Sequence, residues 1–503
     1  MTLLAVPSSP PLTLPRWLPL AAVFVLAVVL RHVVVANSDV SWGLTMAEKW
    51  LDGQRLYVDV IEVNPPATVF LYVVPVAFGR LLGLPAEIMC DALVFAAIGL
   101  SLWLGNHILR RGGVIVRGEQ WPLLTVVGAV LMIIPAQSFG EREHIALILF
   151  LPPLAVAAVR AKGDEPETCT AIVVGIAAAI LTIIKPHFAA AIVFTAGAAA
   201  FWARSWRPLL ALENWIAAVL LAAYGVVVVV AFPQFVSDVL PLLLDVYVPV
   251  KVPFAKLLVF FATPIWVAAL LTIWWLKRGA MVKPPFGLLL AASAGFSVPY
   301  YVQQKAWAYH SYPMIALALI ALVLAFLDRW HRAGADAAVG RPQRLASALV
   351  GAIIAGVSFF WMDFAVDYSA LVGPIRALTP HPKILALSAD LATGHPLTRQ
   401  VEGTWVSRVS AQWITAGVHL RRMSETLDPA ADARLEADAA RDRAMLTEDI
   451  ALNRPDVILV QLTNRFDWLA WARSDPALAA QMALYHPYMT LDNVLVLRRA
   501  DSS

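Results

Sequence analysis

The sequence contains few charged residues and almost no cysteine. Charged residues make up 15% of the 503 residues, against about 25% in soluble domains, while 60% are hydrophobic and the mean hydropathy is +0.71. These values exclude an ordinary soluble protein and predict a polytopic membrane protein. The net charge of +3 is too small to indicate a nucleic-acid partner. Cys90 and Cys169 lack metal-ligand spacing and are expected near opposite membrane faces, so no disulfide is predicted.

Apolar runs long enough to cross a bilayer predict a polytopic α-helical fold with about eleven transmembrane helices. The first run follows Arg16 and lacks a small-residue cleavage site, so we expect an uncleaved signal anchor. One further run, 67–84, is ambiguous because it contains Pro75 and Arg80. The eleven predicted spans lie near 17–36, 87–109, 121–137, 144–160, 169–185, 188–203, 211–231, 257–276, 285–302, 312–327 and 345–363.

The basic residues decide how the ambiguous run is placed. If 67–84 lies in the membrane interface, the clusters between the other runs all fall on one side, which the positive-inside rule makes cytoplasmic. We therefore expect 38–86 to be one long external loop with interfacial helices. The clustered residues are Arg110, Arg111, Arg117, Arg160, Lys162, Arg204, Arg207, Lys277, Arg278, Lys283, Arg329, Arg332, Arg341 and Arg344.

The composition changes after the last span. Residues 364–503 contain many charges, β-like runs at 384–389, 457–461 and 494–497, and a helical middle from about 405 to 452. The pattern predicts a membrane domain over 1–363 and a small soluble α/β domain over 364–503. The predicted topology places the second domain outside the cell membrane.

Four short polar constellations fall at the external ends of the predicted spans. They are Asp39 with Asp52, Asp59, Glu62 and Asn64, then 137–144, 185–187 and 303–310. A charge at the bilayer centre costs about 2.5–3.5 kcal/mol, so we expect these residues to line a wet cavity. Arg142, Lys185 and Lys305 are predicted at the height of a lipid phosphate, which makes them candidate phosphate ligands.

The first external loop contains Asp39, Trp42, Gly53, Tyr57, Asp59 and Asn64-Pro65-Pro66. With these residues it resembles the first external loop of the GT-C glycosyltransferases. It is similar to bacterial members related to protein mannosyltransferases and to aminoarabinose or arabinofuranosyl transferases. The resemblance implies a polyprenyl-phosphate sugar donor and a glycan, lipid or protein acceptor outside the cytoplasmic membrane. Such relatives often show a second acidic motif in the next external loop, where Glu141 or Glu143 would be its counterpart.

Glycosyl transfer from such a donor needs a base for the acceptor hydroxyl and cations for the departing phosphate. Asp39 is the predicted base, and a single base favours inversion. Arg142, Lys185 and Lys305 are the predicted phosphate ligands. A divalent metal remains an open alternative, although no ligand spacing such as H-E-x-x-H is present. Further substrate-binding candidates are Tyr57, Asp59, Glu141, Glu143, His144, His187 and His310.

Each candidate also has a structural interpretation. Asp39 fits a helix-ending acid, 141–144 fit a charged turn with His144 as a helix cap, and Lys185 and His187 fit interfacial anchors. Trp307, Tyr309 and Tyr312 fit an aromatic belt, and Asp52, Asp59 and Glu62 fit a solvated face. The alternative functions are a lipid-linked sugar flippase or transporter, an O-antigen ligase or polymerase, and a scaffold. The Ala- and Arg-rich composition suggests a bacterial cytoplasmic membrane.

Overall fold

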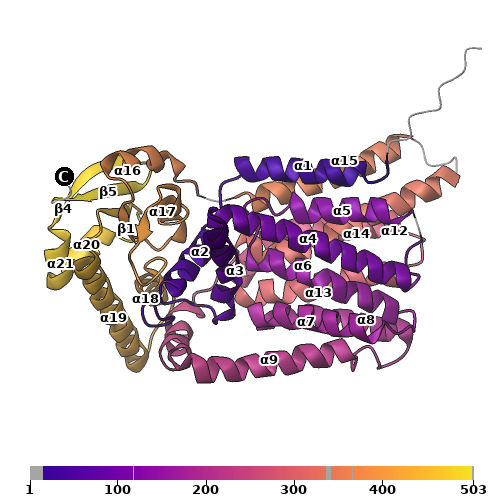
Figure 1. Ribbon diagram of the computed structural model, residues 1–503, viewed down its shortest axis with the longest axis horizontal. Helices are drawn as coiled ribbons and strands as arrows, with labels where there is room; N and C mark the ends of the chain where they lie inside the picture. The colour runs from indigo at the N-terminus through magenta and orange to yellow at the C-terminus, as the bar shows by residue number, and fades with distance from the viewer. Residues whose placement is uncertain (1–14, 117, 336–340, 365, 501–503) are drawn as a thin grey trace, which may run out of the picture.

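Apolar helices lie side by side in a bundle, and a region with a β-sheet lies at one end of it (Figure 1). The computed structural model describes residues 15–116, 118–335, 341–364 and 366–500. The bundle helices are α1 (Leu18–Val33), α4 (Ala86–Arg111), α5 (Gln120–Met132), α6 (Arg142–Arg160), α7 (Thr168–Ile184), α8 (Ala189–Ala203), α9 (Leu212–Ala231), α12 (Ala262–Lys277), α13 (Pro284–Gln303), α14 (Ala308–Ala335) and α15 (Arg341–Met362).

Each of the eleven predicted spans overlaps one of these helices, but the number of crossings is not confirmed. Within the described residues, seven helices are long and apolar enough to cross a membrane, and α1 with the next helix forms an eighth if that pair, bent by 78°, is one span. Helices α5, α7 and α12 are apolar but shorter. Helix α5 stops at Met132, ahead of Pro135 and a short 3₁₀ turn, η1 (Ala136–Ser138).

The bundle has two chemically different ends. We call the end beside the β-sheet the sheet end; it holds the connections 34–37, 133–141, 185–188 and 304–307. The opposite, far end holds the connections 112–119, 161–167, 204–211 and 278–283. The clustered Lys and Arg residues belong to the far end, and Arg117 among them lies outside the described residues.

Two helices of the long loop 38–86 lie between the bundle and the sheet (Figure 1). They are α2 (Ser38–Leu51) and α3 (Ala67–Leu82). Helix α3 contains Pro75 and ends at Gly83, whose φ of 66° is the left-handed conformation that glycine adopts most easily. The loop therefore contains two helices, and their position at a membrane interface stays a prediction.

The C-terminal region, residues 366–500, contains a mixed sheet with the order β2-β1-β3-β5-β4 among the described strands. Strands β1 (Lys383–Leu387), β3 (Val457–Gln461) and β5 (Val494–Arg499) match the predicted runs. The short strand β2 (Thr404–Trp405) and the mostly exposed edge strand β4 (Tyr485–Leu491) had no apolar pattern to reveal them. β1 pairs in parallel with β2 and β3, while β5 pairs antiparallel with β3 and β4. The α-helices of the C-terminal region are α16 (Val372–Leu378), α17 (Leu397–Gln400), α18 (Trp413–Ser424), α19 (Pro429–Asn453), α20 (Trp468–Ser474) and α21 (Pro476–Met482).

The C-terminal region and the loop 38–86 share one apolar core. Trp42, Met46 and Val60 pack in the same cluster as Ile384 and Trp405. Burial of this shared surface holds the sheet against α2.

Polar contacts reinforce this shared core. Arg399 binds Glu48 of α2 through two hydrogen bonds (2.6 and 2.9 Å) and Glu87 of α4 through a third (2.5 Å). Lys49 Nζ donates to the carbonyl of Ser407 (2.8 Å). The sheet region is thus fixed to both α2 and α4.

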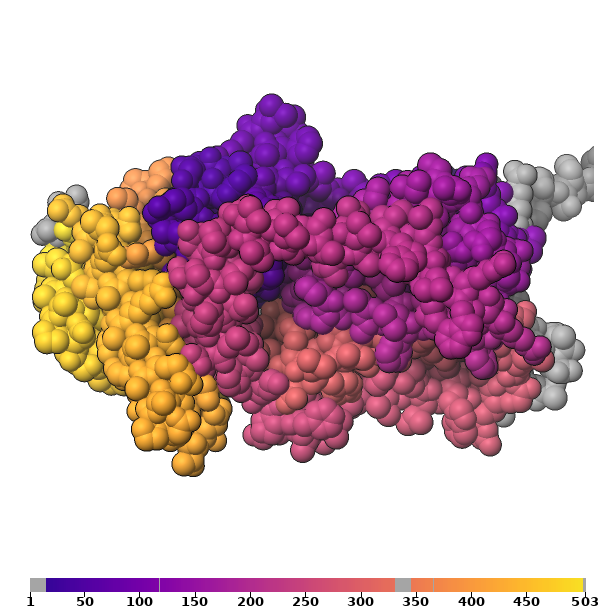
Figure 2. All heavy atoms as spheres, turned by 90° about the horizontal axis from the view of Figure 1, so that it is seen from below, coloured from indigo at the N-terminus to yellow at the C-terminus, as the bar shows by residue number. Residues whose placement is uncertain are grey.

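Between α9 and α12 the chain forms a series of short helices at the sheet end. These are η3 (Phe235–Val239), α10 (Leu240–Leu242), η4 (Leu243–Tyr247) and α11 (Phe254–Val259). Figure 2 shows α9 and this following segment, in magenta, bordering a hollow in the surface next to the rest of the bundle. The segment also contacts α18 of the C-terminal region.

Candidate active site

Asp39 lies in the first turn of α2, directly after the bend that follows α1. Asn37 caps this helix, because its side-chain oxygen accepts hydrogen bonds from the backbone N–H groups of Asp39 (2.7 Å) and Val40 (3.2 Å). A carboxylate in the first turn is also favoured by the helix dipole. The Asp39 side chain keeps 26% of its surface exposed.

Arg142 begins α6 and reaches across to Asp39. Its Nη2 donates to Asp39 Oδ1 at 2.9 Å, and its Nε lies 3.6 Å from Glu141 Oε2. The connection before Arg142 is held by Tyr72, whose hydroxyl donates to the carbonyl of Gly140 (3.0 Å). The Arg142 side chain is only 6% exposed, so a buried cation is bound to a more open acid.

A second ion pair adjoins the first. Lys185 ends α7 in an extended conformation before Pro186, and its Nζ donates to Glu143 Oε1 at 2.5 Å. His310 Nε2 lies 3.5 Å from the same oxygen, and the Lys185 ammonium lies 5.7 Å from the Tyr309 ring centre. Residues of four separate connections thus meet at the sheet end. We call Asp39, Glu141, Arg142, Glu143, Lys185 and His310 the polar cluster.

Several buried atoms of the polar cluster have no hydrogen-bond partner in the described part of the chain. They are Glu141 Oε1, Glu143 Oε2 and His310 Nδ1. A buried polar group left without a partner costs about 1–3 kcal/mol. Atoms of this kind indicate room for water or for the hydroxyl groups of a ligand.

Burial shifts two acids of the polar cluster, Asp39 and Glu141, toward their neutral forms. Burial raises the pKa of the Asp39 carboxyl, against the opposing effect of Arg142 and Lys185. Burial and then the neighbouring Asp39 raise the pKa of Glu141 to about 8. Burial lowers the pKa of the Lys185 ammonium. Glu141 is therefore mostly protonated at neutral pH and can donate a hydrogen bond.

Lys305 and His187 lie outside this ion-pair network. Lys305 Nζ donates to the carbonyls of Tyr247 (2.7 Å) and Val250 (2.6 Å) and lies 4.1 Å from the Tyr247 ring centre. Burial and then the nearby Lys251 lower the pKa of Lys305 to about 8. His187 Nε2 lies 3.3 Å from the amide nitrogen of Gln303.

Three other predicted substrate-binding residues bind the protein itself. His144 Nδ1 accepts from the Gly140 N–H (3.0 Å), and its Nε2 contacts the Leu131 carbonyl (2.8 Å), so the ring holds the connection before α6. The Tyr57 hydroxyl donates to the Asn64 carbonyl (2.8 Å). Asp59 pairs with Arg55 at the surface (3.0 Å).

Glu62 is the residue that the sequence analysis misjudged. The expected solvated face is wrong for it, because its side chain is buried. Its carboxylate accepts from Trp42 Nε1 (2.8 Å) and from the Asn64 N–H (3.0 Å), and its charge raises the pKa of Asp39. Trp42, one helical turn after Asp39, was a signal for such a partner, since a buried indole N–H needs an acceptor.

The described residues contain no group of three or more His, Cys, Asp or Glu side chains placed to hold a metal ion. Asp39 pairs with Arg142, and Glu143 pairs with Lys185.

No protein-family model matches the chain, and no curated protein matches it in sequence. Among solved structures, it is similar to ArnT from Cupriavidus metallidurans bound to undecaprenyl phosphate, with 14% identity, a TM-score of 0.55 and coverage of 96% of this chain and 98% of that one. The arabinofuranosyltransferase AftD from mycobacteria matches with 14% identity and a TM-score of 0.41, over 95% of this chain and 40% of AftD. The chain therefore has the fold seen in ArnT, as the resemblance of its first external loop predicted.

Proposed function

We propose that the protein is a GT-C glycosyltransferase that moves one sugar from a polyprenyl-phosphate donor to an acceptor outside the bacterial cytoplasmic membrane. The observation that supports this most strongly is the meeting of Asp39 with Arg142 and Lys185 at one end of a membrane bundle. ArnT, which has the same fold, was solved with undecaprenyl phosphate bound. A base beside two buried cations is what transfer from such a lipid phosphate requires.

In the proposed reaction, the acceptor hydroxyl oxygen attacks the anomeric carbon while Asp39 takes its proton. The bond from the anomeric carbon to the phosphate oxygen breaks, and the polyprenyl phosphate leaves with the electron pair. Asp39 suits the role of base because it is more exposed than Glu141 or Glu143. Direct attack with one base inverts the anomeric centre.

Arg142, Lys185 and Lys305 are proposed to bind the phosphate. Arg142 has five N–H donors, and its contacts with Asp39 and Glu141 engage only part of them. A phosphate beside Arg142 competes with Asp39 for the guanidinium. Binding of the donor would thereby weaken the Asp39–Arg142 pair and free the carboxylate for the acceptor proton.

The test uses purified protein in nanodiscs and a radiolabelled polyprenyl-phosphate sugar. Wild type is expected to release or transfer labelled sugar, and Asp39→Asn is not. Asp52→Asn is a matched control on the same helix's end, because Asp52 is 58% exposed and pairs with Arg80. If labelled lipid only changes leaflet, and Asp39→Asn does so equally well, a flippase replaces the transferase. The acceptor class is read from which glycan, lipid or protein receives label.

Membrane sidedness is tested separately. We propose that the sheet end lies outside the cell, because the basic clusters belong to the far end. A reporter fused after Arg344 should then read cytoplasmic, and one fused at residue 503 external. The opposite result would place the polar cluster on the cytoplasmic side.

A further inference from the structure

An aromatic group lies directly beside the polar cluster. Trp307 stacks on Tyr309 (ring centres 5.7 Å apart, planes at 28°) and lies 5.1 Å from His310. Its ring is also 6.5 Å from Tyr247, which in turn is 6.1 Å from Trp413 of the C-terminal region. Three different parts of the chain, the α13–α14 connection, η4 and α18, thus contribute to one aromatic surface.

Trp307 is the exposed member of this surface. The residue is 40% exposed, whereas Tyr309, on which it stacks, is 8% exposed. Trp307 therefore keeps part of its surface open beside His310. That histidine contacts the buried Glu143, and its Nδ1 has no partner among the described residues.

The backbone before Trp307 is held in an uncommon conformation. Gln304 and Ala306 have φ values of 53° and 59°, in the left-handed region that side chains other than glycine's disfavour. The connection is tied to the segment before α11, because the Val252 N–H donates to the Gln304 carbonyl (2.8 Å). Such conformations persist where the surrounding structure imposes them, and they are enriched at ligand sites.

A membrane-interface belt does not account for this arrangement. Belt residues lie at the lipid boundary with their polar edge in the headgroup layer, as Trp206 at the far end is placed to do with 78% exposure. Trp307 instead faces Tyr247, whose other neighbour Trp413 belongs to the sheet region.

We propose that Trp307, with Tyr247 and Trp413, binds a sugar ring. The C–H groups on one face of a sugar ring form an apolar surface that packs on an aromatic face, while its hydroxyls point outward to polar partners. His310, whose ring lies 5.1 Å from Trp307 and whose Nδ1 has no partner among the described residues, is placed to supply such a partner. This inference rests on the proposed transferase function and deepens it, because the ring belongs either to the donor or to a saccharide acceptor.

The experiment measures binding of methyl pyranosides and methyl furanosides to the full chain in nanodiscs, by saturation-transfer-difference NMR. Wild type is expected to bind a cyclic glycoside but not a linear alditol. Trp307→Ala should weaken binding about tenfold, the value of one good aromatic contact. Trp307→Phe should retain most of the affinity, and Trp206→Ala should leave it unchanged.

Competition then distinguishes the two sources of the sugar. If the ring is the donor's, polyprenyl-phosphate sugar displaces the glycoside and polyprenyl phosphate alone does not. If it is the acceptor's, neither lipid displaces it. Equal glycoside binding by wild type and Trp307→Ala, or equal binding of the alditol, would overturn the proposal. Trp307-dependent binding in a protein without transfer activity would leave this site standing and remove the transferase.

Discussion

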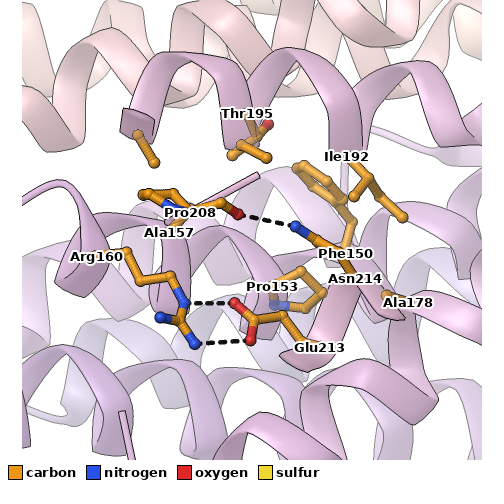
Figure 3. Close-up of a pocket in the computed structure, with 12 residues that line it drawn as sticks. Phe150, Pro153, Ala157, Arg160, Ala178, Ile192, Thr195, Pro208, Glu213 and Asn214 are labelled. Atoms are coloured by element: carbon orange, nitrogen blue, oxygen red, sulfur yellow. Dashed lines mark hydrogen bonds and ion pairs between the residues drawn. The ribbon is translucent and has the colours of Figure 1, made fainter. Parts of the chain in front are cut away.

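The two ends of the bundle each bury an arginine beside glutamates, but they treat it differently. At the far end, Arg160 binds Glu213 through Nε (2.6 Å) and Nη2 (2.9 Å) (Figure 3). Its Nη1 pairs with Glu165. Within the described residues, neither Arg160 nor Glu213 has a buried atom without a partner. At the sheet end, Glu141 and Glu143 each keep such an atom beside Arg142 and Lys185.

The surroundings of the far-end arginine and of the sheet-end cluster also differ. The far-end pair borders a cavity of about 30 Å³ lined mainly by apolar side chains such as Phe150 and Ile192 (Figure 3). That volume holds only a few water molecules. At the sheet end, one of the two pairs contains the partly exposed Asp39, and the partly exposed Trp307 lies nearby. A fully satisfied ion pair joins helices, whereas a partly satisfied one beside an opening is prepared for a ligand.

The largest expected effect that separates the two ends is on turnover. Asp39→Asn should lower the transfer rate by roughly 10²–10⁴-fold, the usual value of general-base assistance, with little change in thermal unfolding. Glu213→Gln, the matched change at the far end, should leave turnover per folded molecule unaltered. The measurement is single-turnover sugar transfer, normalised to folded protein. Equal losses in both variants would contradict the comparison.

The second largest effect is on stability and belongs to the far end. Arg160→Met should destabilise the protein by about 3–5 kcal/mol, because Glu213 is left buried without its counter-charge. Adding Glu213→Leu should recover most of that loss, since a well-packed apolar pair replaces a buried ionic one. Unfolding in detergent, followed by circular dichroism, compares the single and double variants. Failure of the second substitution to restore stability would argue that Arg160 does more than join α6 to α9.

The pH dependence of transfer sharpens the comparison further. Asp39 must be ionised to act as base, so activity should fall as the pH decreases through its pKa, which burial places above that of an ordinary aspartate. Arg142 lowers this pKa, so Arg142→Gln should move the acid limb of kcat/KM to higher pH. Arg160→Gln should not move it. If the acid limb of kcat/KM is unshifted in Arg142→Gln, Asp39 is not the base whose ionisation limits the reaction.

The smallest effect concerns Glu141. Its pKa is raised from 4.5 to about 8, so the folded state holds a proton that the unfolded state releases between these values. The associated stability is complete below pH 4.5 and is lost as the pH rises toward 8. Glu141→Gln, which cannot ionise, should match wild type at pH 5 and be the more stable of the two at pH 8.5. Melting temperatures at both pH values test this, with the exposed Glu167→Gln as control.

The sequence predicted where the polar residues gather, because the positive-inside rule sets the direction of every helix and so the end at which each connection lies. The sequence did not predict which of these residues pair with one another. Arg142 pairs with Asp39, and Lys185 pairs with Glu143, through tertiary packing that no local pattern encodes. His144 and Glu62 show the same limit, since only the folded connections reveal which backbone and indole N–H groups they serve.

Secondary structure shows a related limit. Helices were located from apolar runs, yet α5 and α12 proved too short to establish eleven crossings, because helix ends depend on local breaks such as the one at Pro135. Strands β1 and β3 are buried and were visible as apolar runs. β4, at the sheet edge, is largely exposed and left no such signal.

The ion pairs of Arg399 with Glu48 and Glu87 can form only after the C-terminal region has been synthesised. A nascent chain that has inserted all its helices still lacks the residues that cover Trp42 and neutralise those two acids. Helix α2, which carries Asp39, gains its final support only when the last part of the polypeptide has been synthesised and has folded. A chain truncated before this region would expose the apolar surface around Trp42 and leave Glu48 and Glu87 without Arg399.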